Sequence, residues 1–182
     1  MKIKYLFLIF LILIEYVSIG QTSYKLDDKN GFKQFKLGSH LNSIKNIVNQ
    51  ESILVLKGVT TYKYIAKEIT EFSGVKIEKI DLDFFQNKLY EIRIGFSNFT
   101  NNDYSITEFN TVTAALVSSF GNFIQCANND PSLLNCAIWD GKKVRLDNVR
   151  MNATNKPDGL VGGYLLFIDK ELEKLQQNSE ID

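Results

Sequence analysis

Two aspartates at alternate positions, Asp81 and Asp83, are the side chains of this sequence best spaced for acid–base chemistry. They fall on the polar side of an alternating stretch, and Glu91 and Arg93 fall on the polar side of the next one. A glycosidase needs little more than two such carboxylates. A solvated sheet face with alternating charges predicts the same residues and is far commoner. Nothing in the sequence forces these carboxylates into apolar surroundings, so the solvated face is the preferred interpretation.

The sequence lacks the residues and motifs that other kinds of catalytic or cofactor site need. His40 is the single histidine, so a His-based metal cluster or a catalytic triad has no second member. His40 lies at the expected start of a helix, where an exposed surface role is usual. No G-x-S-x-G, P-loop or G-x-G-x-x-G motif occurs. Gly162-Gly163 lies in a strand-like stretch, where a β-bulge explains it better than phosphate binding. We therefore expect no catalytic residue, no metal and no cofactor.

Cys126 and Cys136 are the only two cysteines, and they predict a disulfide. An even pair closing a short loop is typical of an oxidising compartment. The spacing is not C-x-x-C, which argues against a thioredoxin-like redox pair, and two thiols alone do not make a zinc site.

The first residues resemble a signal peptide. Lys2 and Lys4 form a positive start, an apolar run covers residues 5–14, and a cleavage point lies before Gln21. The run is shorter than the roughly 20 residues that a membrane-spanning helix needs. Cleavage would leave no integral membrane span, and an uncleaved N-terminal anchor is the alternative. The sequence thus predicts a periplasmic or secreted protein.

Composition and charge narrow the class of partner. The chain carries 21 basic and 21 acidic residues, and removal of Lys2, Lys4 and Glu15 leaves a net charge of −1. No field of one sign remains to attract nucleic acid or an anionic membrane. About 160 residues after cleavage fit one globular domain.

Alternating apolar residues predict the hairpin that carries the aspartates. Residues 75–85 place Ile80, Leu82 and Phe84 on one face, and residues 89–96 return with the same period. Gln86-Asn87 is a plausible turn, because asparagine tolerates positive φ.

Helices are predicted on both sides of this hairpin. A first helix starts at Ser39, with an apolar stripe that runs to Val48. A second covers residues 106–120 and opens with the capping box of Ser105 and Glu108. Strands at residues 134–139, 143–151 and 160–168 follow, and a short helix ends the chain near Gln177.

This order predicts an α+β fold, an antiparallel sheet with helices packed on one face. Helix, strand, long strand and strand occur twice, so two tandem αβββ units and a non-repetitive fold of the same order are both open. The expected divisions are a signal peptide (1–20), a flexible segment (21–31), one domain (32–177, with halves 32–102 and 103–177) and a tail (178–182).

Aromatic residues on strand faces are the candidates for binding. Tyr62 and Tyr64 share one face of a predicted strand, and Trp139 ends another. On an exposed sheet face such residues suit a protein partner, since Tyr and Trp dominate interface hot spots. The alternative is that they complete the core.

Three stretches carry a resemblance to a known family: Phe35-Lys-Leu-Gly-Ser-His-Leu-Asn-Ser-Ile-Lys, Tyr62-Lys-Tyr, and Leu82-Asp-Phe-Phe-Gln-Asn-Lys-Leu-Tyr-Glu-Ile. Their pattern is similar to the β-lactamase-inhibitor-protein-like repeat fold and to the small lipoprotein of the outer-membrane β-barrel assembly machinery. The resemblance implies a helical layer packed on an antiparallel sheet. The lipidated cysteine of that lipoprotein has no counterpart near Gln21, and no functional residue carries over.

These observations lead to three functional hypotheses. The first is a non-enzymatic protein-binding module of the periplasm or cell exterior that uses a sheet face. The second is a carrier of a small apolar ligand held between sheet and helices. The third is a hydrolase that uses Asp81 and Asp83.

Overall fold

A computed structural model describes residues 25–50, 56–97, 103–126, 130–152 and 161–181. The predicted signal peptide (1–20) and the first part of the predicted flexible segment lie outside these ranges.

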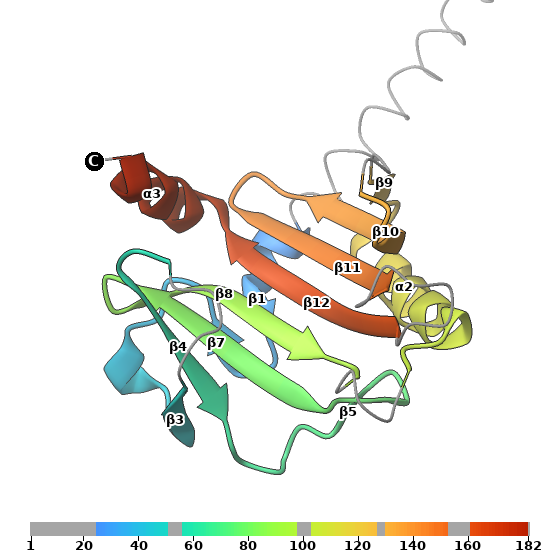
Figure 1. Ribbon diagram of the computed structural model, residues 1–182, viewed down its shortest axis with the longest axis horizontal. Helices are drawn as coiled ribbons and strands as arrows, with labels where there is room; N and C mark the ends of the chain where they lie inside the picture. The colour runs from blue at the N-terminus through green and yellow to red at the C-terminus, as the bar shows by residue number, and fades with distance from the viewer. Residues whose placement is uncertain (1–24, 51–55, 98–102, 127–129, 153–160, 182) are drawn as a thin grey trace, which may run out of the picture.

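An antiparallel sheet of eight strands forms the body of the protein (Figure 1). In spatial order its strands are β3 (Ile47–Gln50), β4 (Val59–Tyr64), β7 (Lys79–Phe85), β8 (Lys88–Gly95), β12 (Val161–Asp169), β11 (Val144–Asn152), β10 (Leu133–Asp140) and β9 (Ile124–Gln125). Two small hairpins stand outside this sheet, β1 (Gly31–Phe32) with β2 (Phe35–Lys36) and β5 (Glu71–Phe72) with β6 (Val75–Lys76). The prediction of a mixed fold built on an antiparallel sheet is confirmed.

Two antiparallel meanders make up most of the large sheet. Strands β4, β7 and β8 form the first, β10, β11 and β12 form the second, and β8 pairs with β12 to join them. The predicted β7–β8 hairpin is confirmed. Its turn residues Gln86 and Asn87 both have positive φ, 50° and 63°, the geometry that a two-residue type I′ turn needs.

The second predicted helix is confirmed as α2 (Ile106–Phe120). Ser105 Oγ accepts the Glu108 N–H at 3.1 Å, and Glu108 Oε2 accepts the Ser105 N–H at 2.7 Å. This reciprocal capping satisfies two backbone donors that a helix start otherwise leaves without partners. The C-terminal helix α3 (Lys170–Ile181) begins after Asp169 as expected and continues past the predicted end at Gln177.

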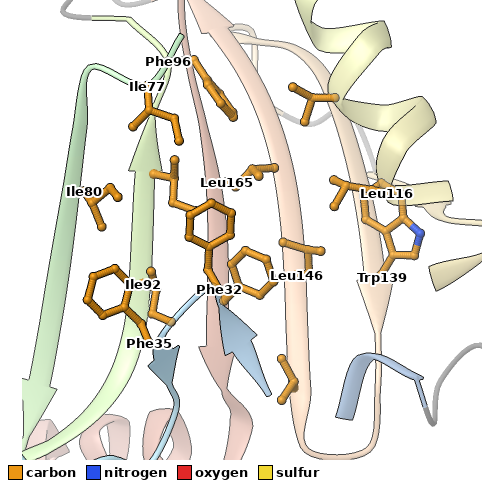
Figure 2. Packing of buried hydrophobic residues seen from close by; sticks show 14 of the residues in the cluster. Phe32, Phe35, Ile77, Ile80, Ile92, Phe96, Leu116, Trp139, Leu146 and Leu165 are labelled. Atoms are coloured by element: carbon orange, nitrogen blue, oxygen red, sulfur yellow. The ribbon is translucent and has the colours of Figure 1, made fainter. Parts of the chain in front are cut away.

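The core lies between the sheet and the layer formed by α2 and the β1–β2 hairpin (Figure 2). Alternate residues of the central strands, such as Ile92 and Leu165, point into this layer and are fully buried. Phe32 and Phe35 cover them at one end and Leu116 of α2 at the other (Figure 2). Burial of this apolar surface is the main force that holds the two layers together.

Helix α3 packs elsewhere. Its residue Leu172 joins Phe85 and Tyr90 in a second, smaller cluster. Phe85 follows Phe84 in β7, and Phe84 belongs to the main core, so alternation places Phe85 on the opposite face. The finer expectation, that all helices pack on one face, is therefore not confirmed.

The predicted first helix is wrong. His40 caps a short 3-10 turn, η1 (Leu41–Ser43), and the chain then extends into β3. The β-branched residues of β3 fit a strand better than a helix, and the edge of β4 offers a partner, because Ile47 pairs with Tyr64. Val48, the last residue of the expected apolar stripe, is exposed. An αβββ unit is thus absent from the described part of the first half.

The predicted flexible segment is ordered from Lys25 onward. Residues 25–29 form a helical turn, in which Leu26 is fully buried. The Asp27 carboxylate accepts three backbone N–H groups at the β10–β11 turn, those of Lys142 and Lys143 at 2.9 Å and Val144 at 3.0 Å. These bonds tie the beginning of the domain to a hairpin far away in sequence.

Candidate functional site

The aromatic residues proposed for binding lie in or against the core. Trp139 is 3% exposed and Tyr64 is 7% exposed, and both belong to the main cluster. The Trp139 Nε1–H donates to the Gly121 carbonyl at 2.8 Å, which closes the end of α2. Tyr62 is partly buried and packs edge-on against Phe84. A binding face built from the exposed rings of Trp139 and Tyr64 is therefore ruled out by their burial.

Trp139 nevertheless packs against an exposed aromatic residue, Phe123, that was not among the predicted binding residues. Phe123 lies with its ring centroid 5.5 Å from that of Trp139 and is 41% exposed. Ile124, the first residue of β9, is 63% exposed. We call Phe123 and Ile124 the β9 edge patch, because β9 is the last strand on this side of the sheet. The sequence held one sign of this patch: two adjacent apolar residues, Phe123 and Ile124, stand between the glycine that ends a predicted helix and a cysteine.

The predicted disulfide is confirmed and fixes this edge. Cys126 follows β9 directly and is bonded to Cys136 of β10, with their Cα atoms 5.5 Å apart. This separation is usual for a disulfide. Among the described residues, the ladder between β9 and β10 consists of the pairs Ile124–Ile138 and Gln125–Ala137. The covalent link therefore holds a strand that hydrogen bonds alone would hold weakly.

Asp81 and Asp83 are buried, which corrects the expectation of a solvated face. They are only 2% and 4% exposed. Asp81 Oδ2 lies 2.8 Å from Lys79 Nζ, and Thr61 Oγ1 donates to Asp83 Oδ1 at 2.6 Å. The long Lys79 side chain remains 40% exposed, so the basic group lies at the surface above a buried acid.

Arg93 brings Asp83 and Glu91 together. The two acids are direct neighbours on β7 and β8. Arg93 Nη2 lies 3.3 Å from Asp83 Oδ2 and donates a second hydrogen bond to Glu91 Oε1. Burial raises the pKa of both carboxyl groups, and the Arg93 guanidinium limits that rise.

This arrangement favours a structural role over hydrolysis. A paired-carboxylate hydrolase needs one carboxyl group to donate a proton and another to attack or to activate water. Here Asp83 is held by both Arg93 and Thr61, and the second candidate, Asp81, is held by Lys79. Alternation in the sequence thus grouped the four predicted charged residues correctly, but Asp81 and Asp83 are buried rather than solvated.

Two hollows flank Tyr64. The first, of about 370 Å³, lies between the end of β4 and the start of β7. The second, of about 480 Å³, lies between Tyr64 and the segment from Ser43 to Asn46. The Tyr64 hydroxyl accepts from Gln34 Nε2 at 3.0 Å and donates to Glu68. The Glu68 hydrogen bond, together with burial, raises the pKa of Tyr64, so its phenol stays protonated at neutral pH.

Neither a candidate metal cluster nor a candidate membrane-spanning helix occurs in the described ranges. Within these ranges, no group of three or more His, Cys, Asp or Glu side chains is placed to hold a metal ion. No helix there is both long enough and apolar enough to cross a membrane.

Comparison of the chain with protein-family models, with curated proteins and with solved structures found no match. The resemblance to the β-lactamase-inhibitor-protein-like fold therefore stays a prediction, and the function is argued from the geometry of this chain alone.

Proposed function

We propose that this chain is an exported, non-enzymatic protein-binding module and that the β9 edge patch is its contact surface. The observation that carries this proposal is the exposure of Phe123 and Ile124 at an open sheet edge. In the described part of the chain, no strand pairs with the outer side of β9. An open edge presents backbone N–H and C=O groups that a further strand can bind.

The partner is an extended apolar segment of another protein. Natural sheet edges are usually protected by lysine, proline or a bulge, and residues 123–125 (Phe-Ile-Gln) carry neither of these residue types. An added strand would gain main-chain hydrogen bonds from β9 and apolar contacts from Phe123 and Ile124. Phe123 rests on the buried Trp139 ring, so little side-chain entropy is lost when a partner covers it.

Replacing Ile124 by lysine should weaken partner binding at least tenfold, since a central apolar contact is worth about 2 kcal/mol or more. Ile106→Lys is the matched control, because Ile106 is an isoleucine 45% exposed on α2. Envelope extract of the source organism is passed over both variants and the wild type. A partner retained by wild type and Ile106→Lys and lost by Ile124→Lys is then purified and titrated calorimetrically.

Two results would contradict the proposed site. If every retained protein binds Ile124→Lys as well as wild type, the β9 edge patch is not the contact surface. If light scattering shows a dimer that Ile124→Lys dissociates, the occupant of the edge is a second copy of this chain.

The export part of the proposal is supported by the signal-like residues 1–20 and by the disulfide, which persists outside the reducing cytosol. Intact-mass spectrometry of the exported protein should give a chain that begins at Gln21, and reduction should add the mass of two hydrogen atoms. A mass that includes residues 1–20 contradicts cleavage, and a mass unchanged by reductant contradicts the bridge.

We also propose that the two meanders are tandem units of one ancestral motif. The strand order supports this, since β4–β7–β8 and β10–β11–β12 meet through their third strands. The unit is then three strands, because the segment expected to be its helix, residues 39–48, forms a 3-10 turn and a strand instead.

A further inference from the structure

Strand β9 is the shortest strand of the large sheet and ends it beside β10 (Figure 1). It has two residues, Ile124 and Gln125, and both are exposed. Two register pairs join it to β10, and no described strand lies on its other side. A strand with so few pairs and no buried side chain has little stability of its own.

Contacts at its two ends keep β9 in place. Before the strand, the Trp139 Nε1–H donates to the Gly121 carbonyl at 2.8 Å, and the Phe123 ring packs on the Trp139 ring. After the strand, Cys126 is bonded to Cys136 of β10. The Gly121 hydrogen bond holds the end of α2 rather than β9 itself. The disulfide is therefore the strong attachment, and the Phe123 ring, 41% exposed, is the weak one.

Opening of this bridge should release β9. In the chain-entropy model, a bridge between residues that are 10 apart in the chain shifts the closing equilibrium on the order of 100-fold. In the reduced chain, two register pairs and one partly exposed ring would have to make up this factor. On release, Phe123 leaves Trp139, which is 3% exposed while β9 is in place.

The bridge lies where a thiol–disulfide exchange protein can reach it. Both cysteines are half-buried, and they lie at the end of the sheet, with no described strand beyond them. Thiols of a cytosolic chain stay reduced, whereas disulfides form and persist after export. The bridge therefore distinguishes the chain before export from the chain after it.

We propose that oxidation of Cys126 and Cys136 after export assembles the β9 edge patch, so that the chain binds its partner only outside the cytosol. This inference rests on the function proposed above. A protein disulfide of the envelope accepts two electrons and becomes a dithiol, the two cysteine protons end on that dithiol, and the Sγ–Sγ bond forms. The exchange passes through a mixed disulfide.

The reduced chain should bind the partner weakly because its edge is not formed. A partner strand needs β9 to be ordered beside β10 before it can add to the sheet. The apparent affinity therefore falls by the fraction of molecules in which β9 is ordered. Oxidation removes this cost without adding any contact to the partner.

Trp139 is the only tryptophan of the chain, so its fluorescence reports on β9 without any partner. In Cys126→Ser/Cys136→Ser, its emission maximum should shift to longer wavelength, and quenching by acrylamide should increase. Hydrogen exchange of the amides that pair residues 124–125 with 137–138 should accelerate about tenfold or more. Amides of β7 and β8 should keep wild-type exchange, because they lie in the other half of the sheet.

Wild type treated with a dithiol reductant should show the same changes and reverse them on reoxidation. Cys126→Ser/Cys136→Ser treated with the same reductant is the matched control and should not change further. Trp139 emission and β9 exchange that are the same with and without the bridge overturn the proposal. Loss of exchange protection in β7 and β8 as well overturns it, because the bridge then holds the whole domain rather than the patch.

The partner retained through Ile124 should bind the oxidised chain and lose about tenfold or more in affinity for Cys126→Ser/Cys136→Ser. Equal affinity for the two chains overturns the proposal even where β9 opens. If no retained protein depends on Ile124, the proposed function fails, whereas Trp139 emission and hydrogen exchange still decide whether the bridge assembles the β9 edge patch.

Discussion

Replacing Arg93 by methionine should lower the free energy of unfolding by about 2–4 kcal/mol at pH 7. The variant leaves Asp83 and Glu91 as buried neighbours without the guanidinium that holds both. Removing one partner of a fully buried ion pair typically costs about 3–5 kcal/mol. The Arg93 side chain is 33% exposed, so solvent already weakens part of the interaction and the lower figure applies. Urea unfolding measured by fluorescence gives the value.

The loss of unfolding free energy caused by Arg93→Met should depend on pH. Burial raises the pKa of Asp83 and Glu91 above their ordinary values. A carboxyl group with a raised pKa binds more protons in the folded than in the unfolded protein between the two pKa values. Stability therefore falls as pH rises from the ordinary carboxyl range through the raised pKa. Loss of Arg93 raises both folded-state pKa values further. The penalty of Arg93→Met should thus be small near pH 4 and larger at pH 7.

Arg150→Met is the control for this experiment. Arg150 donates to two neutral acceptors, the Tyr104 carbonyl at 2.7 Å and Asn135 Oδ1 at 3.2 Å. Its replacement should cost the same at pH 4 and pH 7. Adding Glu91→Gln to Arg93→Met should recover part of the loss at pH 7, because one buried charge is removed. An Arg93→Met penalty that is equal at both pH values shows that the buried carboxylates are not its cause.

The sequence predicted correctly those elements that are stabilised by residues close to one another in the chain. The β7–β8 hairpin has strict alternation and an Asn-containing turn, and α2 has a capping box, so both could be placed. Residues 39–48 carry a helix-like stripe, yet they form a 3-10 turn and a strand. Pairing with β4 decided that segment, and an inter-strand partner distant in the chain leaves no trace in local periodicity.

The wrong predictions about the candidate site residues have the same cause, since burial depends on contacts between residues distant in the chain. Alternation correctly placed Asp81 and Asp83 on the face opposite the core, but it cannot show how long neighbouring side chains cover that face. Alternation left Trp139 open to an exposed sheet face or to the core, and its contacts with the end of α2 and with Phe123 decide for the core. The exposed residues Phe123 and Ile124 lie in a segment too short for any periodicity.

Gly163→Ala should lower the free energy of unfolding by about 3 kcal/mol, the upper end of the usual range for an overpacked core. A Cβ atom at Gly163 would lie 1.7 Å from Tyr104 Cδ1. The expected β-bulge at Gly162-Gly163 is wrong, because both residues keep the regular β11–β12 register. The glycine is needed at residue 163 because the Tyr104 ring lies against the strand backbone.

Tyr104 cannot move aside to make room for that methyl group. Its ring is fully buried and stacks on Phe96 with centroids 5.0 Å apart, and its hydroxyl donates to Asn148 Oδ1 at 3.2 Å. Gly95→Ala is the comparison variant: its Cβ would lie 2.9 Å from Lys79 Cγ, so the partly exposed Lys79 side chain must shift, and the variant should cost less than Gly163→Ala, whose Cβ meets a fully buried ring. Thermal and urea unfolding measure both variants. The double variant Gly163→Ala/Tyr104→Ala should be less destabilised than the sum of the two single variants. Additive losses would show that the Tyr104 ring is not what demands glycine at this position.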